Sequence, residues 1–316
     1  MNGTQSRQPV IAAVCPGEES KAALEYAVRV AVSRGCPLQV VHVWHPQHGG
    51  PETVLLTFTE PSTIATETLA GSVEHATDAC AGDVPVGGRL LRGPTSRALV
   101  EASHGAGLVV MGHRSRSLAA HALSPSLCGR VAGRSHAPVL AVPAGWVAPG
   151  PGDKPKPVTV GVDVPSRSRP LLREAFRAAD ELGADLRVLH VWRPPRLAEE
   201  AALGGLAGDP WMPSTDRGLV DELDAVVRDV AADFPDVVWT TEAVPAVVTA
   251  ALQSAASGSS LMVVGRHDAL LPVGSRLGSV AAYVLRKATC PVLIVPPRPE
   301  PFATAPAGSR QRRVGG

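Results

Sequence analysis

The sequence predicts an α/β protein made of two tandem domains, each a doubly wound sheet of five parallel strands. Two observations support this fold class: strand and helix patterns alternate along the chain, and the whole series occurs twice within the 316 residues. A third observation concerns function. The second copy contains the spacing Gly265-x-x-Asp268, followed after nine residues by Gly278-Ser279.

The repeat is visible as two sets of equivalent positions. In the front half, equivalents lie 148 positions apart: Cys15 and Asp163, Ser20 and Ser168, Gly35 and Gly183, His42 and His190, Val43 and Val191, Trp44 and Trp192. In the back half the separation is 153, as between Gly112 and Gly265. A net insertion of five residues therefore lies within the second copy. We expect domains at residues 1–146 and 158–297, both of ordinary domain size.

Each copy opens with a short apolar strand, at Val10 to Val14 and at Val158 to Val162. The near-continuous apolar run is typical of a strand that is covered on both faces. A helix follows, with apolar residues at helical spacing. Its ends are marked by Ser20 and Gly35 in the first copy and by Ser168, Pro170 and Gly183 in the second.

The remaining strands follow in the same order in both copies. Those of the first copy are expected at Leu38 to Trp44, before Gly93-Pro94, at Leu108 to Met111 and at Val139 to Val142; those of the second at Leu186 to Trp192, before Pro245, at Leu261 to Val264 and at Val292 to Val295. Helical stretches separate them, including Leu219 to Ala232 and helices that begin near Ser126 and Ser279. Strand, helix and strand in succession form a right-handed βαβ unit, so each sheet should be parallel.

The composition favours an ordinary cytoplasmic protein. A formal net charge of +1 indicates neither a nucleic-acid partner nor a membrane surface. No run of about 18 apolar residues is present, and the apolar run from Val10 to Cys15 is too short for a signal peptide. The five cysteines form no C-x-x-C pair and no zinc spacing, so we expect small buried hydrophobic residues: Cys15, Cys36, Cys80, Cys128 and Cys290.

Two segments should lie outside the folded domains. Residues 147–157 are rich in proline and glycine and are expected to form a semi-extended linker. Residues 298–316 contain several prolines and arginines and are expected to be a disordered tail.

The glycines of the second copy fit an anion site. Gly265 has no Cβ, so a ligand can approach the backbone closely where the strand ends. Gly278 and Ser279 open a helix, whose free N–H groups and dipole favour an anion such as phosphate. In sheets of this kind, ligands bind beyond the carboxyl ends of the strands at the topological switch point.

Taken together, these residues resemble the universal stress protein family. The shared elements are a strand that ends at Asp163, the end of the second strand at His190-Val191, the glycine spacing after Val263-Val264, and the closing segment Cys290 to Val295. The resemblance covers nearly the whole chain, as a tandem of two Rossmann-like family domains. It implies an adenine nucleotide as ligand, usually ATP, with or without Mg²⁺.

The resemblance also implies roles for particular residues. Asp163 would face the ribose or adenine, and the backbone around Val191 would contact the adenine edge. Arg266 and His267 lie where they could assist, although no feature of the family fixes them. The last strands of the two domains would pair across a pseudo-two-fold axis, which would cover both sheet edges. Two such chains could in addition form a homodimer.

The sequence departs from the family pattern in both copies. In the second copy, Asp268 occupies the middle glycine position, and its carboxylate would repel a triphosphate by on the order of 1 kcal/mol unless a metal ion or arginine intervenes. A cleft filled by Leu270 or Pro272 would argue against binding. The first copy departs further, with substitutions at three motif positions: Cys15, Ser115 and Pro125. We therefore expect the nucleotide in the second domain.

Structural explanations exist for the same residues. Gly265 and Gly278 could simply end a strand and begin a helix, and Asp163 could cap the following helix. His42 and His190 fall inside strand patterns and are expected to be packed or hydrogen-bonded. Other histidines show no metal-ligand spacing: His104, His113, His121 and His136.

The sequence contains no catalytic centre that we can identify. The segment Gly129 to Ser135 lacks the lysine and the spacing of a phosphate-binding P-loop, and neither G-x-S-x-G nor H-E-x-x-H occurs. We expect a regulatory or sensor protein of the stress response that binds ATP rather than an enzyme, while slow ATP hydrolysis stays open. The alternative is an adaptor module that binds no nucleotide and acts through an unknown protein partner.

Overall fold

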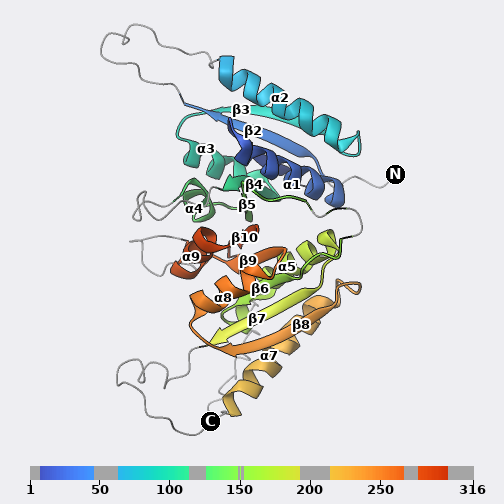
Figure 1. The fold of residues 1–316 in the computed structure, drawn as a ribbon, viewed down its shortest axis with the longest axis vertical. Coiled ribbons are helices and arrows are strands. Elements are labelled where there is room, and N and C mark those ends of the chain that lie inside the picture. The colour runs from blue at the N-terminus through green and yellow to red at the C-terminus, as the bar shows by residue number, and fades with distance from the viewer. Residues whose placement is uncertain are drawn as a thin grey trace, which may run out of the picture.

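The computed structural model of the chain describes residues 8–45, 63–113, 126–148, 150, 153–192, 214–266 and 277–297. These residues form two α/β halves that share one ten-stranded sheet (Figure 1). The expected tail at 298–316 lies outside the described residues. None of the described helices is long and apolar enough to span a membrane.

The strands follow the predicted order in each half. They are β1 (Val10–Val14), β2 (Leu38–Trp44), β3 (Val86–Arg92), β4 (Leu108–His113) and β5 (Val139–Pro143), then β6 (Val158–Val162), β7 (Leu186–Trp192), β8 (Trp239–Pro245), β9 (Leu261–Gly265) and β10 (Val292–Val295). The sheet order is β3-β2-β1-β4-β5-β10-β9-β6-β7-β8. Within each half all neighbouring strands are parallel, which confirms the predicted doubly wound fold.

The described helices are α1 (Glu18–Arg34), α2 (Thr63–Cys80), α3 (Thr95–Ala102), α4 (Leu127–Ala132), α5 (Arg169–Leu182), α7 (Ser214–Ala231), α8 (Val248–Ser257) and α9 (Ser279–Lys287). One buried cluster packs the sheet against α1, α2, α5 and α7. A second cluster packs the opposite face against α3, α4, α8 and α9. Since side chains alternate along a strand, neighbouring residues such as Val10 and Ile11 serve opposite clusters. Each cluster runs through both halves.

The helix ends confirm some sequence signals and correct others. Gly35 and Gly183 adopt left-handed conformations and end α1 and α5, as predicted. Ser20 does not begin α1, because the helix starts at Glu18 with Gly17 as N-cap. The Ser20 hydroxyl instead accepts a hydrogen bond of 2.8 Å from the Cys15 backbone and ties the helix to the end of β1.

The cysteines follow the expectation with one exception. Cys36, Cys80, Cys128 and Cys290 are buried, and none of them forms a disulfide within the described part of the chain. Cys15 is exposed, because it lies one residue beyond β1, where the chain leaves the sheet.

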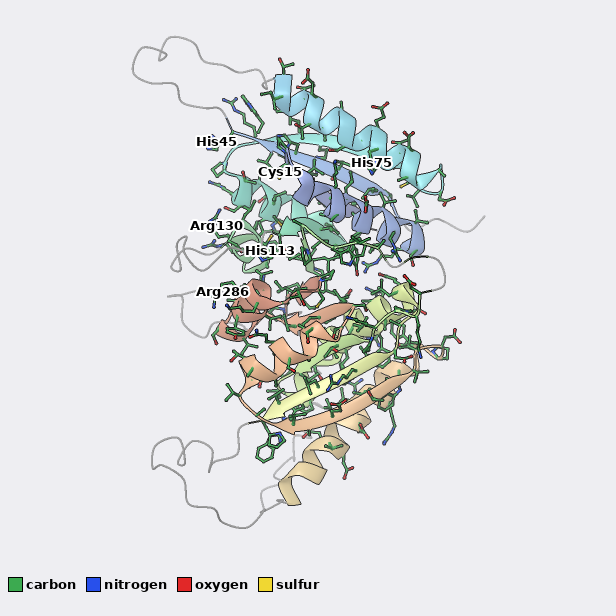
Figure 2. All side chains as sticks on the ribbon, in the orientation of Figure 1. Cys15, His45, His75, His113, Arg130 and Arg286 are labelled. Atoms are coloured by element: carbon green, nitrogen blue, oxygen red, sulfur yellow. The ribbon has the colours of Figure 1, made fainter. Side chains whose placement is uncertain are left out.

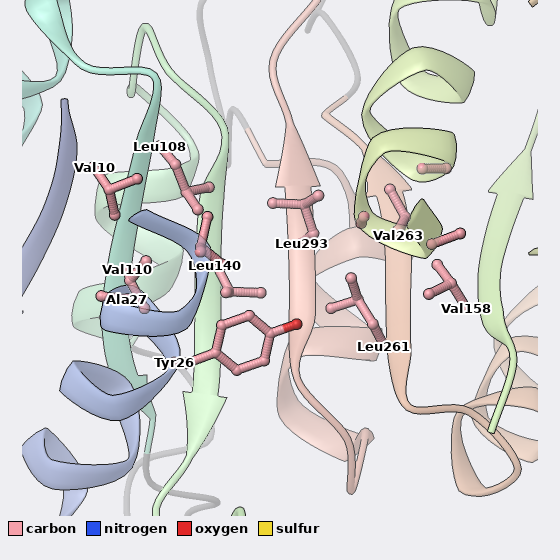
Figure 3. Packing of buried hydrophobic residues seen from close by; sticks show 14 of the residues in the cluster. Val10, Tyr26, Ala27, Leu108, Val110, Leu140, Val158, Leu261, Val263 and Leu293 are labelled. Carbon is pink, nitrogen blue, oxygen red and sulfur yellow. The ribbon is translucent and has the colours of Figure 1, made fainter. Parts of the chain in front are cut away.

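The two halves join through antiparallel pairing of β5 and β10, which confirms the predicted pairing of the last strands. Val139, Leu140 and Ala141 lie opposite Ile294, Leu293 and Val292. Figure 3 shows Leu140 and Leu293 facing each other across this boundary, with the Tyr26 ring beside them. All these side chains are buried, so the boundary is part of the continuous core.

A partly buried ion pair adds a polar contact between the halves. The guanidinium of Arg34, at the end of α1, donates to both carboxylate oxygens of Glu181 on α5, at 2.7 and 3.2 Å. Nearby, Tyr26 packs against Trp146 with ring centroids 4.8 Å apart. Trp146 therefore anchors the chain just before the expected linker.

Truncation of Leu293 tests the contribution of the shared core. Leu293→Ala should lower the free energy of unfolding by about 2–5 kcal/mol, because the substitution leaves a cavity between the halves. Val247→Ala is the matched control: Val247 is 49% exposed, so its truncation should change stability by less than about 0.5 kcal/mol. Urea denaturation of the full chain measures both. Equal effects would show that the boundary does not stabilise the protein.

Candidate functional site

The candidate site of the second domain lies at the carboxyl ends of β6 and β9. The sheet order reverses between these strands, because β6 pairs with β7 on one side and with β9 on the other. Gly161 lies opposite Val264, so the next residues along each strand bring Asp163 and Gly265 to the same edge. This is where doubly wound sheets bind their ligands.

Asp163 is exposed directly after β6. It makes no hydrogen bond or ion pair with any other residue in the described part of the chain. The N-cap of α5 is Ser168, and a short 3₁₀ turn, Pro165–Arg167, comes before it. Asp163 therefore does not cap α5, and its carboxylate is open to a ligand.

Val191 lies in β7, beyond the last residue that pairs with β6. The final pair between those strands is Val162 with His190, whereas Val191 still pairs with Val244 of β8 on its other side. Its backbone edge toward β6 is thus outside that ladder and lies on the same side of the sheet end as Asp163. This position suits the contact with a purine edge that the family resemblance implies.

Gly265 and Gly278 play different roles. Among the described residues, a Cβ on Gly265 would meet Leu171 at an ordinary contact of 3.7 Å, so these residues leave room for a side chain there. Gly278 has φ 82° and ψ 153°, a conformation that side chains strongly disfavour. The second glycine is therefore required by the backbone at the start of α9, as one structural explanation anticipated, whereas the first leaves space beside the sheet end.

The amino terminus of α9 differs from its equivalent in the first domain. In the first domain the Ser126 hydroxyl caps α4 by accepting a hydrogen bond of 3.1 Å from the Gly129 backbone. Among the described residues, no side chain caps α9, and Ser279 is exposed. No described side chain thus occupies the first-turn N–H groups of α9, and such groups favour an anion.

Arg266 is directed to the domain boundary rather than to the candidate site. Its guanidinium donates to the carbonyls of Ala132 at 3.1 Å and Ser135 at 2.8 Å, both in the first domain. His267 and Asp268, together with Leu270 and Pro272, lie outside the described residues. The structure thus brings Asp163, Val191 and Gly265 to one edge, places the start of α9 after the loop that leaves β9, and assigns the Arg266 side chain to the domain boundary.

The boundary contacts are reciprocal, which the sequence reasoning missed. His113 is the equivalent of Arg266, and its imidazole forms a hydrogen bond with the backbone of Leu285, the equivalent of Ala132. Figure 2 shows Cys15 and His113 in the first domain, with His113 nearer the second. The available signal was the shared position of His113 and Arg266, which directly follow the equivalent glycines Gly112 and Gly265.

His113 is buried, and desolvation lowers its pKa although the hydrogen bond with Leu285 acts in the opposite direction. Its Nε2 atom has no hydrogen-bond partner among the described residues. Protonation would therefore place a charge at the domain boundary with only one stabilising contact.

The equivalent edge of the first domain is occupied by contacts within the chain. The Cys15 thiol lies 3.2 Å from the Ser20 hydroxyl, and no carboxylate occupies this position. The Cys128 thiol, in the first turn of α4, donates to the Gly112 carbonyl at 3.3 Å, and burial raises its pKa to about 12. This edge lacks the free acid and the open helix terminus of the second domain. Ser115 and Pro125 lie outside the described residues.

His42 and His190 are structural, as expected. Each is buried, and each donates from Nδ1 to the carbonyl that ends the neighbouring strand: His42 to Val14 at 2.9 Å and His190 to Val162 at 3.0 Å. Across the described ranges, no three potential metal ligands gather into a group.

Comparisons with known proteins agree with the fold and the repeat. The model of the universal stress protein family matches residues 6–143 and 155–296, so the chain belongs to this family as a tandem of two of its domains. It is 26% identical to universal stress protein Rv1996 of Mycobacterium tuberculosis over 317 aligned positions, covering 93% of this chain and 96% of the relative. Identity to a universal stress protein of Mycolicibacterium smegmatis is 29%, covering 92% and 97%.

Solved structures share the two-domain architecture. The crystal structure of a universal stress protein from Archaeoglobus fulgidus superposes with a TM-score of 0.65 at 15% identity, covering 92% of this chain and 96% of that one. A putative universal stress protein from Pseudomonas aeruginosa gives a TM-score of 0.58 at 16% identity, covering 92% and 93%. At these identities, the likeness establishes the fold alone.

The two glycines should respond differently to a methyl group. Gly278→Ala should lower the free energy of unfolding by about 1–3 kcal/mol, because a side chain is strained at its positive φ. Gly265→Ala should change it by less than about 0.5 kcal/mol, because the added Cβ meets no close neighbour. Urea denaturation of both variants checks this contrast, and it is refuted if the two variants are equally stable.

A fall in pH should lower the free energy of unfolding because His113 is buried. Between pH 6.5, the ordinary histidine pKa, and the lower pKa of the folded state, the unfolded chain binds a proton that the folded chain does not. Above this pH range, the contribution of His113 to the free energy of unfolding is fully present. It decreases as the pH falls through the range, by at most about 1.4 kcal/mol per pH unit. His113→Gln should flatten this slope in urea denaturation between about pH 7.5 and about pH 5. Identical slopes in parent and variant would contradict the assignment.

Proposed function

We propose that the second domain binds ATP at the carboxyl ends of β6 and β9 and that the protein acts as a nucleotide-responsive regulator. The observation that carries this proposal is the contrast between the two domains at equivalent positions. Asp163 is exposed with no partner among the described residues, and α9 begins without a side-chain cap. In the first domain, Cys15 and Ser126 contact their own chain instead.

Each part of the nucleotide has a suitable group on this edge. The Asp163 carboxylate would accept hydrogen bonds from the ribose hydroxyls, and the free backbone edge at Val191 would meet the adenine. The N–H groups at the start of α9 and the Ser279 hydroxyl would hold phosphate oxygens. When bound, Mg²⁺ would supply positive charge between the phosphates and Asp268. The proposed role is ligand binding, without a catalytic step.

The same geometry offers a route from the nucleotide to the rest of the molecule. Gly265 borders the proposed site, and the next residue, Arg266, is hydrogen-bonded to the first domain. A ligand that displaces the backbone at Gly265 would therefore act on the boundary contacts. This arrangement supports a sensor in which one domain binds nucleotide and the other transmits the response.

Calorimetric titration with ATP and magnesium tests the proposal. Asp163→Ala should weaken binding by roughly tenfold or more, because a hydrogen-bonded charged group typically contributes about 1.5–3 kcal/mol. The carboxylate is exposed and makes no hydrogen bond or ion pair with the described chain, so the variant should fold normally. Cys15→Ser, at the equivalent first-domain position, is the matched control and should bind ATP like the parent.

Two outcomes would count against the proposal. If the parent protein shows no heat and releases no nucleotide on denaturation, the adaptor that acts through protein partners becomes the better account. If Asp163→Ala and Cys15→Ser lose affinity equally, the nucleotide does not distinguish the domains as proposed.

A further inference from the structure

A second candidate site lies on the first domain, away from the strand ends that we propose for ATP. A cavity of about 520 Å³ opens between α3 and the face of β1, β2 and β3. This volume is in the usual range for small-molecule sites. Its lining includes Ile11, Leu91 and Ala98 as apolar groups and Arg89, Arg92 and Glu101 as charged groups.

The cavity exists because α3 is too short to cover the strands. The eight residues of α3 extend over about 12 Å, whereas the seven residues of β2 or β3 extend over about 23 Å. On β3 the side chains alternate: a Cβ at Gly88 would touch Val73 of α2 on the opposite face. Arg89 and Leu91 accordingly line the cavity, and a Cβ at Gly87 would meet nothing within 4 Å.

In the second domain, the equivalent position is occupied by an ion pair between two neighbouring strands. Gln39 and Arg89 correspond by position to Arg187 and Glu242. In the second domain, the Arg187 guanidinium donates to both carboxylate oxygens of Glu242, at 2.8 and 2.6 Å. This paired geometry is the strong form of an arginine–carboxylate contact.

In the first domain the arginine is on the other strand, β3, and no carboxylate among the described residues pairs with it. Within the described ranges, the hydrogen bond that Arg89 makes is a single one of 3.3 Å to the side-chain oxygen of Gln39. A long contact with a neutral amide leaves most of the guanidinium donors for another acceptor. Arg89 is also exposed at the edge strand, where a ligand can reach it.

The other charged side chains beside the cavity indicate what charge its ligand should carry. Arg92 borders the cavity, but by the same alternation its side chain points with that of Trp44 to the opposite face, where its guanidinium lies 5.5 Å from the centre of the Trp44 ring, so Arg89 is the cation that faces the groove. Glu101 on α3 contributes one negative charge to the lining, which disfavours a doubly charged phosphate more than a singly charged group. The apolar groups favour a hydrocarbon or aromatic body over a bare ion.

We propose that this groove binds a small organic carboxylate with an apolar body, whose carboxylate pairs with Arg89 as Glu242 pairs with Arg187. The apolar body would lie against Ile11, Leu91 and Ala98. The groove would thus give the first domain a ligand of its own, of a different chemical class from the nucleotide.

Titration of the full chain with sodium decanoate tests the inference, with decanol as a probe that has the same body and no charge. The parent should bind decanoate at least tenfold more tightly than decanol. Arg89→Gln should lose this preference. The double variant Gln39→Arg/Arg89→Glu, which installs the second-domain pair, should fold normally and lose decanoate binding. Thermal denaturation checks that both variants are folded.

The inference is overturned if decanoate does not bind, if decanol binds equally well, or if Arg89→Gln binds decanoate like the parent. Titration of the same variants with ATP separates the two proposals. ATP affinity should be unchanged in them, because Arg89 is remote from β6 and β9, whereas Asp163→Ala should leave decanoate binding intact.

Discussion

The antiparallel pairing of β5 with β10 is the constraint on which the rest of the structure depends. Alone, each five-stranded sheet would expose the backbone of its last strand; paired, the two strands bury both edges. The pairing also merges the apolar layers on each face into clusters that cross the whole molecule. It brings the ends of β4 and β9 close to α9 and α4, so that His113 and Arg266 each contact the opposite half.

The two domains have nearly the same fold, but they differ in which polar groups are hydrogen-bonded by other residues of the chain. At the strand ends, the first domain fills its own edge through Cys15 and Ser126, and the second leaves Asp163 and α9 open. On the outer strands the contrast is reversed: Glu242 pairs with Arg187, whereas Arg89 has no carboxylate partner among the residues that the structure describes. The duplication has therefore left one candidate site in each domain, at different places and for different chemistry.

The repeated alternation of strands and helices was sufficient to predict the succession of strands and the parallel sheets, whereas the pairing of the last strands was predicted from the family resemblance. Local signals such as Gly35 and Gly183 also located helix ends correctly. The direction of Arg266 was not predictable, because its partners lie more than 130 residues away in the chain and the contact depends on how the halves pack. The Gln39–Arg89 pair likewise depends on the register of β2 against β3, and the role of Gly278 depends on a backbone angle.

The central claim is that nucleotide binds to the second domain only. The most direct measurement is photo-crosslinking of the full chain with 8-azido-ATP, followed by mass spectrometry of the intact protein and of its peptides. The account predicts one nucleotide per chain, attached to a peptide of the second domain near Asp163 or Val191. Two nucleotides per chain, or an adduct on the peptide that contains Cys15, would contradict it.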